Sequence, residues 1–427
     1  MQGIEWLEGL PNFEADRSVA VSPLENVRVA ASVLGGINSG LRFIHVAGTN
    51  GKGSVAATVA VLLGDMGFRV GLFRSPHLCR LEERVIIDAV PVDAGRLDQE
   101  LAQLAAMTDQ ELVPQLTHFE ALFVAALSVF SLEGCEVAVI EAGLGGRYDA
   151  TNIIDAEVAV ITSIGHDHLN ELGPTLTDVL NHKLGIVHDG ATVCLGPLDD
   201  ALRAVARERL SLNPTIWMDE LEIERFPGVG GQEIIEHSPL GDRSFFIPLF
   251  GEATGFNVML AIHAVEALLG RRLSSERIES GLAHLHLPGC FEVLRGEALV
   301  VVDTAHNREA AAALGVALLE TFGQEYRVGI VLGMSHGRDP GEFLRALALP
   351  EVAVVALLDC GVAPLILRAG VEEVYPNARI LDWSAELRSV GDLLSSLDVE
   401  LILITGSHCA CGTVLCKDTP RLLIEGS

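Results

Sequence analysis

Glycine, lysine and serine are grouped in the run Ala47–Ser54 (AGTNGKGS), between an apolar segment that predicts a strand and one that predicts a helix. Glycines let a backbone approach phosphate oxygens closely, and a helix N-terminus offers free N–H groups and positive potential. Lys52 has the reach for the β- and γ-phosphates of a nucleotide, and the Ser54 hydroxyl suits Mg²⁺. The run therefore predicts a phosphate-binding loop, although Gly53 separates Lys52 from Ser54, unlike the usual Walker spacing. The alternative is a glycine-rich turn with a surface lysine.

Polar residues also follow three other predicted strands. These are Ser75-Pro76-His77 after Val70–Phe73, Glu141–Arg147 after Val137–Ile140, and His166-Asp167-His168 after Val158–Thr162. The carboxyl ends of parallel strands share one edge of a sheet, so we expect these loops to converge on the phosphate loop. A hydroxyl, a carboxylate and an imidazole there are able to hold Mg²⁺ against ATP oxygens. The alternatives are a helix-capping Glu141 and an ordinary loop histidine at position 168.

Lys183 lies in the predicted helix 176–186. As a solvated helix residue it has no chemical role. If it is partly buried and has a lowered pKa, its amine reacts with carbon dioxide to form a carbamate, which is able to ligate a second metal ion. The sequence leaves both interpretations open.

The second half of the chain has two similar loops. Asp303–Asn307 follows the predicted strand Leu299–Val302, and Gly406-Ser407-His408 follows Leu401–Ile404. We expect both loops to face the first half. His408, Cys409, Cys411 and Cys416 suggest a zinc site, but their spacing fits no strong template.

The elements around these loops alternate between β-branched strands and helical patterns, which is typical of a parallel sheet covered by helices on both faces. Residues 226–250, rich in Gly and Pro, predict a short β-rich insertion, and helix 257–269 follows. We therefore predict an α/β fold with two domains. Residues 1–288 form a P-loop ATPase-like, mostly parallel sheet, and residues 289–427 form a smaller Rossmann-like domain.

The composition excludes some partners. The 427 residues carry 58 acidic and 29 basic side chains, a formal charge of -29, which argues against nucleic acid or an anionic membrane as a general partner. The start, Met1 to Glu5, lacks the features of a secretory signal, and no apolar run reaches the ~20 residues of a membrane span. We expect a cytoplasmic protein whose eight scattered cysteines are reduced thiols.

Several ordered motifs together resemble one family. They are Trp6–Leu10, His45–Ser54, Ser75–Leu78, Glu83–Val85, Leu116–Glu120, Glu141–Asn152 and Asp303–Asn307. The chain is similar, over nearly its whole length up to Ser407, to folylpolyglutamate synthase/dihydrofolate synthase of the Mur ligase superfamily. The motifs Gly48–Ser54 and Glu141–Asn152 are together highly specific for it.

The resemblance implies a role for each motif. ATP binding is implied for Gly48, Asn50, Gly51, Gly53, Ser54, Asn257 and Asp303. Mg²⁺ binding is implied for Ser75, Glu141 and His168, and catalytic roles for Lys52, a carbamylated Lys183 and His306. Contacts to the pteroate group are implied for Thr117, His118, Phe119, Glu120, Tyr148, Asp149 and Ala150, and a contact to glutamate for Ser407.

The implied reaction uses ATP to activate a folate or dihydropteroate carboxylate as an acyl phosphate, which the amine of L-glutamate then attacks. We expect a monomer. The sequence departs from the family at Cys290, where arginine is usual, and at Ala253 and Thr254, where a His-Gln pair is common. Two alternatives therefore stay open: a Mur-type amide ligase with another acid or amine, and a catalytically weak nucleotide-binding homologue.

Overall fold

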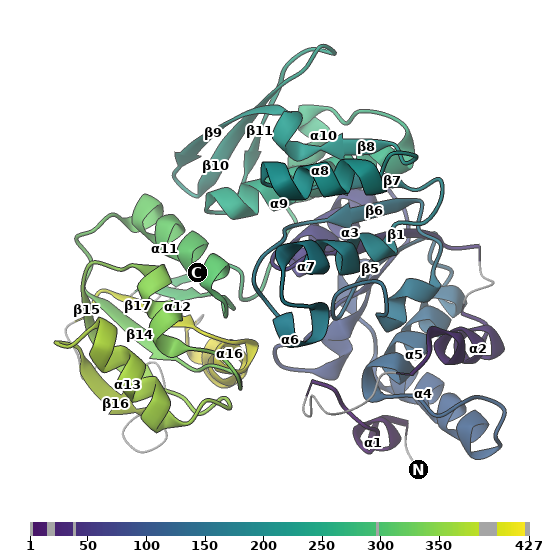
Figure 1. The fold of residues 1–427 in the computed structure, drawn as a ribbon, viewed down its shortest axis with the longest axis horizontal. Coiled ribbons are helices and arrows are strands. Elements are labelled where there is room, and N and C mark those ends of the chain that lie inside the picture. Colours follow the sequence, from purple (N-terminus) through teal and green to yellow (C-terminus); the bar gives the residue numbers. More distant parts are fainter. Residues whose placement is uncertain (1–2, 15–21, 37–39, 296–298, 384–398, 423–427) are drawn as a thin grey trace.

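A computed structural model describes residues 3–14, 22–36, 40–295, 299–383 and 399–422 (Figure 1). Met1 and Gln2, which belong to the start used above to argue against a secretory signal, lie outside these ranges. Within the described ranges, every helix is too short or too polar to cross a bilayer.

The first sheet has eight strands in the order β4-β3-β2-β5-β1-β6-β7-β8. The strands from β2 to β8 in this order run parallel, whereas β3 and β4 are antiparallel additions at one edge. Their bounds are β1 (Arg42–Ala47), β2 (Val70–Phe73), β3 (Val85–Ile87), β4 (Val90–Pro91), β5 (Val137–Glu141), β6 (Val158–Ile161), β7 (Thr192–Leu195) and β8 (Thr215–Trp217).

Helices cover both faces of this sheet because successive residues of the central strands point to opposite sides. Ile44 of β1 faces a core formed with α3 (Lys52–Asp65), α9 (Glu252–Leu269) and α10 (Ser275–Leu282). Phe43 faces the opposite core. The helices there are α1 (Gly3–Glu8), α2 (Leu24–Leu34), α4 (Ala94–Asp109) and α5 (His118–Leu132), and α7 (Leu176–Lys183) and α8 (Asp200–Arg209) pack beyond them on β6 and β7.

The predicted β-rich insertion forms a three-stranded antiparallel sheet that projects at the top of Figure 1. Its strands are β9 (Glu222–Gly228), β10 (Gly231–His237) and β11 (Arg243–Ile247). Phe245 and Ile247 are buried in the core that also contains residues of α9 and α10, which anchors the insertion to the first domain.

The second sheet has six strands in the order β12-β13-β17-β14-β15-β16, all parallel except β12. The strands are β12 (Glu292–Arg295), β13 (Leu299–Val302), β14 (Val328–Leu332), β15 (Val352–Leu357), β16 (Arg379–Asp382) and β17 (Leu401–Thr405). One face packs on α11 (Arg308–Phe322), α12 (Pro340–Leu347) and α13 (Pro364–Val374), and the other on α16 (His408–Leu422). The two layered sheets confirm the predicted fold class.

The oxidation state of four cysteines differs from the prediction. Cys79 is disulfide-bonded to Cys416, and Cys360 to Cys409, so the prediction of reduced thiols is wrong for these four residues. The partners lie 337 and 49 residues apart and meet only after the sheets have formed, so their spacing in the sequence gave no signal. Two of the residues considered for zinc, Cys409 and Cys416, are thus paired with other cysteines.

Candidate active site

The predicted phosphate loop joins β1 to α3, and two of its glycines are required by packing. A Cβ at Gly48 would lie 1.8 Å from Thr162 Oγ1. Gly51 has a φ of +84°, and a Cβ there would lie 2.4 Å from Asn257 Oδ1. The Thr162 hydroxyl also donates to the Asn50 carbonyl at 2.6 Å. The loop is therefore held in one shape directly before the N-terminus of α3, where Lys52 lies with its Nζ 3.3 Å from the Thr49 carbonyl.

Glu141 lies beside this loop, at the end of β5. It is 4% exposed, and its Oε2 accepts the Ser75 N–H at 3.2 Å. A Cβ at Gly53 would lie 3.5 Å from the same oxygen. Burial raises the pKa of Glu141, and the charge of Lys52 opposes this shift. The Ser75 and Glu141 loops thus meet at the side of the phosphate loop. The start of the third predicted loop contacts it as well, because the Gly165 N–H donates to Thr49 Oγ1 at 3.0 Å.

A divalent cation fits the Glu141 carboxylate, because a nearby positive charge offsets the cost of its burial. The described residues contain no group of three or more His, Cys, Asp or Glu side chains suited to a metal ion. Mg²⁺ accepts such a site, because it commonly binds one or two carboxylates and takes its other ligands from phosphates and water. His168 begins the short helix α6 (Leu169–Leu172), and its Nε2 lies 3.7 Å from Asp167 Oδ1.

Lys183, the last residue of α7, is only 3% exposed. Burial and the charge of Lys52 lower the pKa of Lys183 to about 7. A large fraction of this amine is therefore neutral at neutral pH, which is the form that reacts with carbon dioxide. The solvated alternative for Lys183 is excluded by its burial.

Asp167 connects the two domains. Its carboxylate lies 2.7 Å from Arg338 Nη1 and 3.5 Å from His306 Nε2, and it accepts from Asn307 Nδ2 at 3.1 Å. Burial acts to raise the pKa of Asp167, but the His306 hydrogen bond and the His168 and Arg338 charges hold it below its usual range. Arg338 was missed in the sequence, although its position soon after β14 places it at the same sheet edge.

A second contact ties the phosphate loop itself to the second domain. Asn50 and Asn307 exchange side-chain hydrogen bonds of 2.9 and 3.2 Å. Asn307 also caps α11 by accepting the Ala310 N–H. The phosphate loop and the start of α11 are therefore held together by one reciprocal amide pair.

Of the predicted site residues of the second domain, His306 faces Asp167 of the first domain, whereas Asp303 and Ser407 bond within their own domain. Asp303 accepts the N–H groups of Phe291 and Ala305, both at 2.8 Å, and burial raises its pKa to about 6. The His306 ring lies 5.8 Å from that of His408, whose pKa is lowered to about 3 by burial and the His306 charge. Ser407 is 2% exposed and donates to the Gly333 carbonyl at 2.6 Å. Its hydroxyl therefore holds the start of α16.

Cys290 faces the phosphate loop from the domain junction. Its Sγ lies 3.4 Å from Ser54 Oγ, and burial raises its pKa to about 11. The thiol is therefore neutral at physiological pH. This position, where the resemblance led us to expect arginine, therefore contributes no positive charge.

The residues predicted to face pteroate lie around the N-terminus of α5. The Phe119 ring lies against Gly143, where a Cβ would be 2.7 Å from Phe119 Cζ, and 5.6 Å from the Phe73 ring. His118 is 8% exposed, and its Nδ1 is buried without a hydrogen-bond partner. Ala150 is buried, whereas Tyr148 is exposed, with its ring edge toward His182.

Two carboxylates among the residues predicted to face pteroate accept hydrogen bonds from backbone N–H groups. Glu120 accepts the Thr117 N–H at 2.7 Å and the Ser22 N–H at 2.8 Å. Asp149 accepts the N–H groups of Leu144 and Thr151 at 2.7 and 3.0 Å. These bonds shape the loops beside Phe119, and direct contact of either carboxylate with substrate stays a prediction.

Arg84 fixes the loop between β2 and β3. It is 2% exposed, donates to both oxygens of Glu14 at 2.9 and 2.6 Å, and donates to His77 Nδ1 at 2.8 Å. The motif Glu83–Val85 pointed to this position without giving it a role. We infer that Arg84 positions the Ser75 loop.

Known proteins share this arrangement. Residues 46–265 match the Mur ligase middle domain. The dihydrofolate synthase/folylpolyglutamate synthase of Mycobacterium tuberculosis is 32% identical over 76% of this chain and 72% of its own length. The solved M. tuberculosis folylpolyglutamate synthase complexed with ADP has a TM-score of 0.84 at 30% identity, covering 96% of this chain and 98% of that one. Escherichia coli FolC in complex with DHPP and ADP has a TM-score of 0.80 at 25% identity, covering 99% and 98%.

Proposed function

The chain belongs to the folylpolyglutamate synthase/dihydrofolate synthase family of Mur ligases, and from this premise we propose roles for its residues in joining L-glutamate to a folate-type carboxylate. It is an ATP-dependent ligase. The observation that carries the proposal is the contact of the phosphate loop, through Asn50, with the loop of the second domain that contains His306 and Asn307. ATP and the incoming amine therefore meet between the two domains.

In the first step the substrate carboxylate attacks the γ-phosphate, which forms an acyl phosphate and ADP. Lys52 and the N-terminus of α3 stabilise the charge that develops on the phosphate oxygens. A Mg²⁺ ion held by Ser75, Glu141 and His168 would supply further positive charge at those oxygens. We assign Phe119 to stack on the pterin, which would hold the other end of the substrate.

Lys183 supports the metal side of the site in its carbamylated form. The neutral amine attacks carbon dioxide, a C–N bond forms, and one proton leaves to solvent. The product carries a negative charge where a buried ammonium would otherwise stand. The lowered pKa of Lys183 supports this assignment, because the reaction requires the neutral amine.

In the second step the glutamate amine attacks the acyl phosphate and phosphate leaves. His306 lies at the interface with its Nε2 toward Asp167, and we assign it to accept the proton from the amine. The neighbouring His408 is neutral at physiological pH. Contact between the domains excludes water, which would otherwise hydrolyse the acyl phosphate.

The test is phosphate release from ATP with dihydropteroate or tetrahydrofolate and L-glutamate, with the product identified by mass. We expect release that requires both co-substrates and is largely lost in Lys52→Ala. Turnover only with another acid or amine would support a different Mur-type ligase. ATP binding without turnover would support the catalytically weak homologue that the neutral Cys290 favours.

A further inference from the structure

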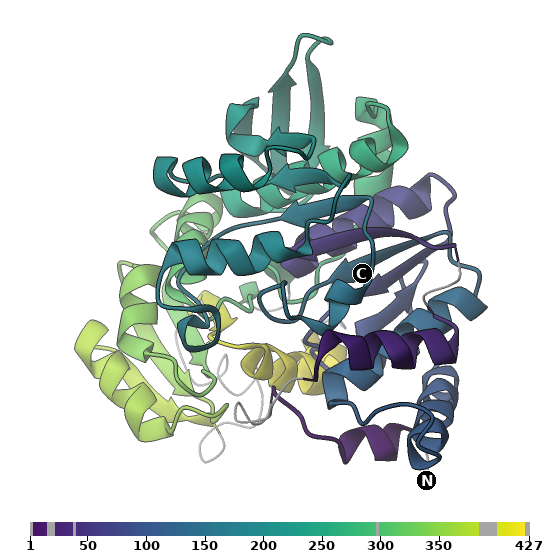
Figure 2. The same ribbon diagram turned by 45° about the vertical axis from the view of Figure 1, so that its right-hand side comes forward.

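The yellow α16 of the second domain lies beside the first domain in Figure 2, and the loop that follows Ser75 contacts it through Leu78. Leu78 packs against the hydrophobic core beneath α16. A Cβ at Gly412 would lie 2.3 Å from the Leu78 carbonyl, so this close approach requires glycine on the helix. Loop and helix are therefore in direct contact.

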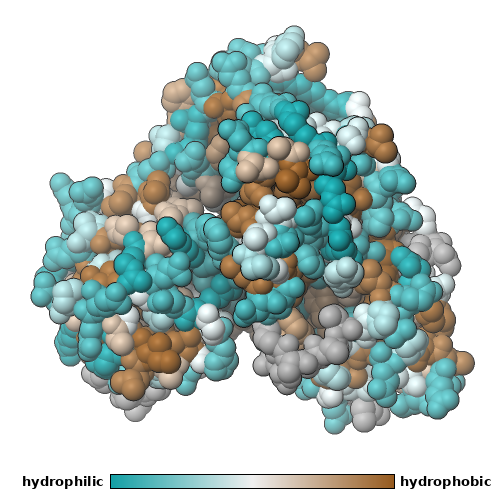
Figure 3. All heavy atoms as spheres, viewed as in Figure 1, coloured by the Kyte–Doolittle hydropathy of each residue, from teal (hydrophilic) through white to brown (hydrophobic). Residues whose placement is uncertain are grey.

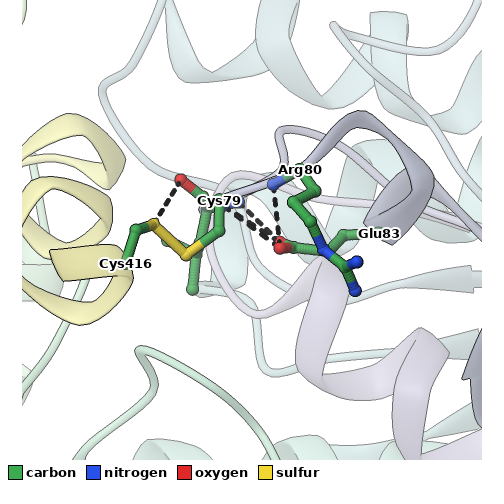
Figure 4. The surroundings of a disulfide bond; sticks show 5 residues. Cys79, Arg80, Glu83 and Cys416 are labelled. Carbon is green, nitrogen blue, oxygen red and sulfur yellow. Dashed lines mark hydrogen bonds between the residues drawn. A yellow bond between two sulfur atoms is a disulfide. The ribbon is translucent and has the colours of Figure 1, made fainter. Parts of the chain in front are cut away.

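A disulfide crosses this contact. Figure 4 shows Cys79 bonded to Cys416 of α16, with the Leu78 carbonyl 3.7 Å from the Cys416 sulfur. The Glu83 carboxylate accepts the N–H groups of Leu78 and Arg80, both at 2.9 Å, and of Cys79 at 3.2 Å, which fixes the loop around the bond. The other described disulfide, Cys360–Cys409, lies within the second domain.

The other contacts between the described parts of the two domains are non-covalent. Phe250 packs on Phe291, with ring centroids 5.5 Å apart, and several pairs near the site are polar. They include the Asn50–Asn307 pair, the Asp167–Arg338 ion pair and the hydrogen bond from the His166 N–H to Glu309. Water is able to hydrate these polar groups when the domains separate, and separation also exposes the Asp167 carboxylate, which is 7% exposed in the docked state. The disulfide does not exchange with water, so while it is intact it keeps the Ser75 loop joined to α16 even when the non-covalent contacts break.

We propose that Cys79–Cys416 is a reversible thiol–disulfide site that controls separation of the two domains. The oxidised form keeps the Ser75 loop joined to the helix that begins at His408. The reduced form lets the domains part, which admits substrates and releases ADP and product. The effect on turnover rests on the proposed function, whereas the effect on domain separation does not.

The reagent class is a small thiol and its disulfide. Cys79 and Cys416 are both exposed, so a reductant thiolate is able to reach either sulfur. Its attack on Cys416 forms a mixed disulfide, breaks the Cys79–Cys416 bond and releases the Cys79 thiolate. A second thiolate attacks the mixed disulfide, giving the free reagent disulfide and the Cys416 thiolate. The two protein thiolates take up two protons, and oxidation by the reagent disulfide reverses every step.

The test compares wild type, Cys79→Ser, Cys416→Ser and Cys360→Ser after treatment with oxidised or reduced glutathione. Peptide mapping identifies the bonds, small-angle X-ray scattering without ligands gives the radius of gyration, and phosphate release gives kcat. Oxidised wild type is expected to be more compact than reduced wild type and to turn over about tenfold more slowly, because domain opening limits release. Cys79→Ser and Cys416→Ser should not respond, and Cys360→Ser should respond like wild type.

Two results would overturn the proposal. One is a mapped Cys79–Cys416 bond with unchanged kcat and radius of gyration. The other is an equal response of Cys416→Ser to oxidation. If reduced wild type shows no folate-dependent turnover, the proposed function fails, and the scattering comparison alone decides the disulfide proposal.

Discussion

Replacing the buried carboxylate of Glu141 distinguishes a metal-binding role of this residue from a structural one. Burial raises its pKa above the unfolded value, so the ionised group costs stability at neutral pH. Glu141→Gln removes this cost, and we expect an unchanged or higher melting temperature with most activity lost. Added Mg²⁺ should restore part of the rate. The control is Glu136→Gln, at an exposed position before β5.

A large fall in melting temperature for Glu141→Gln, together with an unchanged Mg²⁺ dependence, would show that the residue is structural.

Lys183 gives a chemical prediction that depends on pH. Since its folded pKa is about 7, the neutral fraction and the carbamate both decrease as the pH falls below that value. Carbon-13 NMR with labelled bicarbonate should show a carbamate signal that is lost in Lys183→Ala. The variant should be weak, and acetate should recover some rate. Asn181→Ala, on the same helix, is the control.

A spectrum without a carbamate signal from active, nucleotide-bound enzyme would contradict the assignment of Lys183.

Cys290 gives a prediction of gained affinity. An arginine there could donate charge-assisted hydrogen bonds to the nucleotide, which the neutral thiol 3.4 Å from Ser54 cannot do. Cys290→Arg should tighten ATP binding by ~1.5–3 kcal/mol, measured by calorimetry and by a lower KM for ATP. Cys290→Ser is the neutral control. Unchanged or weaker binding in the arginine variant would mean that the nucleotide is held differently here.

At the scale of elements, a buried charge cluster joins the insertion to the first domain. His263 of α9 lies 3.4 Å from Glu236 of β10 and 3.3 Å from Glu266, and Arg243 bridges the same two carboxylates. Burial acts to lower the pKa of His263, but the adjacent Glu236 and Glu266 carboxylates raise it overall. The stabilisation is therefore complete below the unfolded pKa of about 6.5 and is lost as the pH rises through the higher folded value.

Thermal melting at a series of pH values checks this prediction. Wild type should lose stability above about pH 6.5, and His263→Asn should be less stable at low pH with a flatter profile above it. His284→Asn, at an exposed position after α10, should keep the wild-type profile. Parallel profiles for His263→Asn and wild type would contradict a charged His263.

Elements with strong local signals were predictable from the sequence. The predicted helix His118–Leu132 matches α5 because Thr117 and Glu120 form a capping box at its start. The predicted strand Val70–Phe73 matches β2 because its buried residues are apolar and bounded by polar loops. The Glu141 and Ser75 loops meet because parallel strands end at one edge.

At the scale of the molecule, the particular residue pairs that join the two domains were not predictable. Arg338 reaches Asp167, and Cys416 reaches Cys79, only because the second domain docks on the first. Neither the hydrophobic periodicity of the sequence nor the spacing of its motifs indicates how two domains dock on each other. Figure 3 shows the two lobes with a hollow between them on one face.

The order of the two domains along the chain has a consequence for biosynthesis. Both the eight-stranded sheet and the insertion are complete before β12 begins at Glu292, so the ribosome releases one entire domain before the other starts to emerge. Domains generally fold as units in that vectorial order. Cys79 therefore waits as a free thiol in a folded domain until Cys416, 337 residues later, is translated. Formation of that cross-link marks a chain whose second domain has been synthesised as far as α16 and has docked on the first.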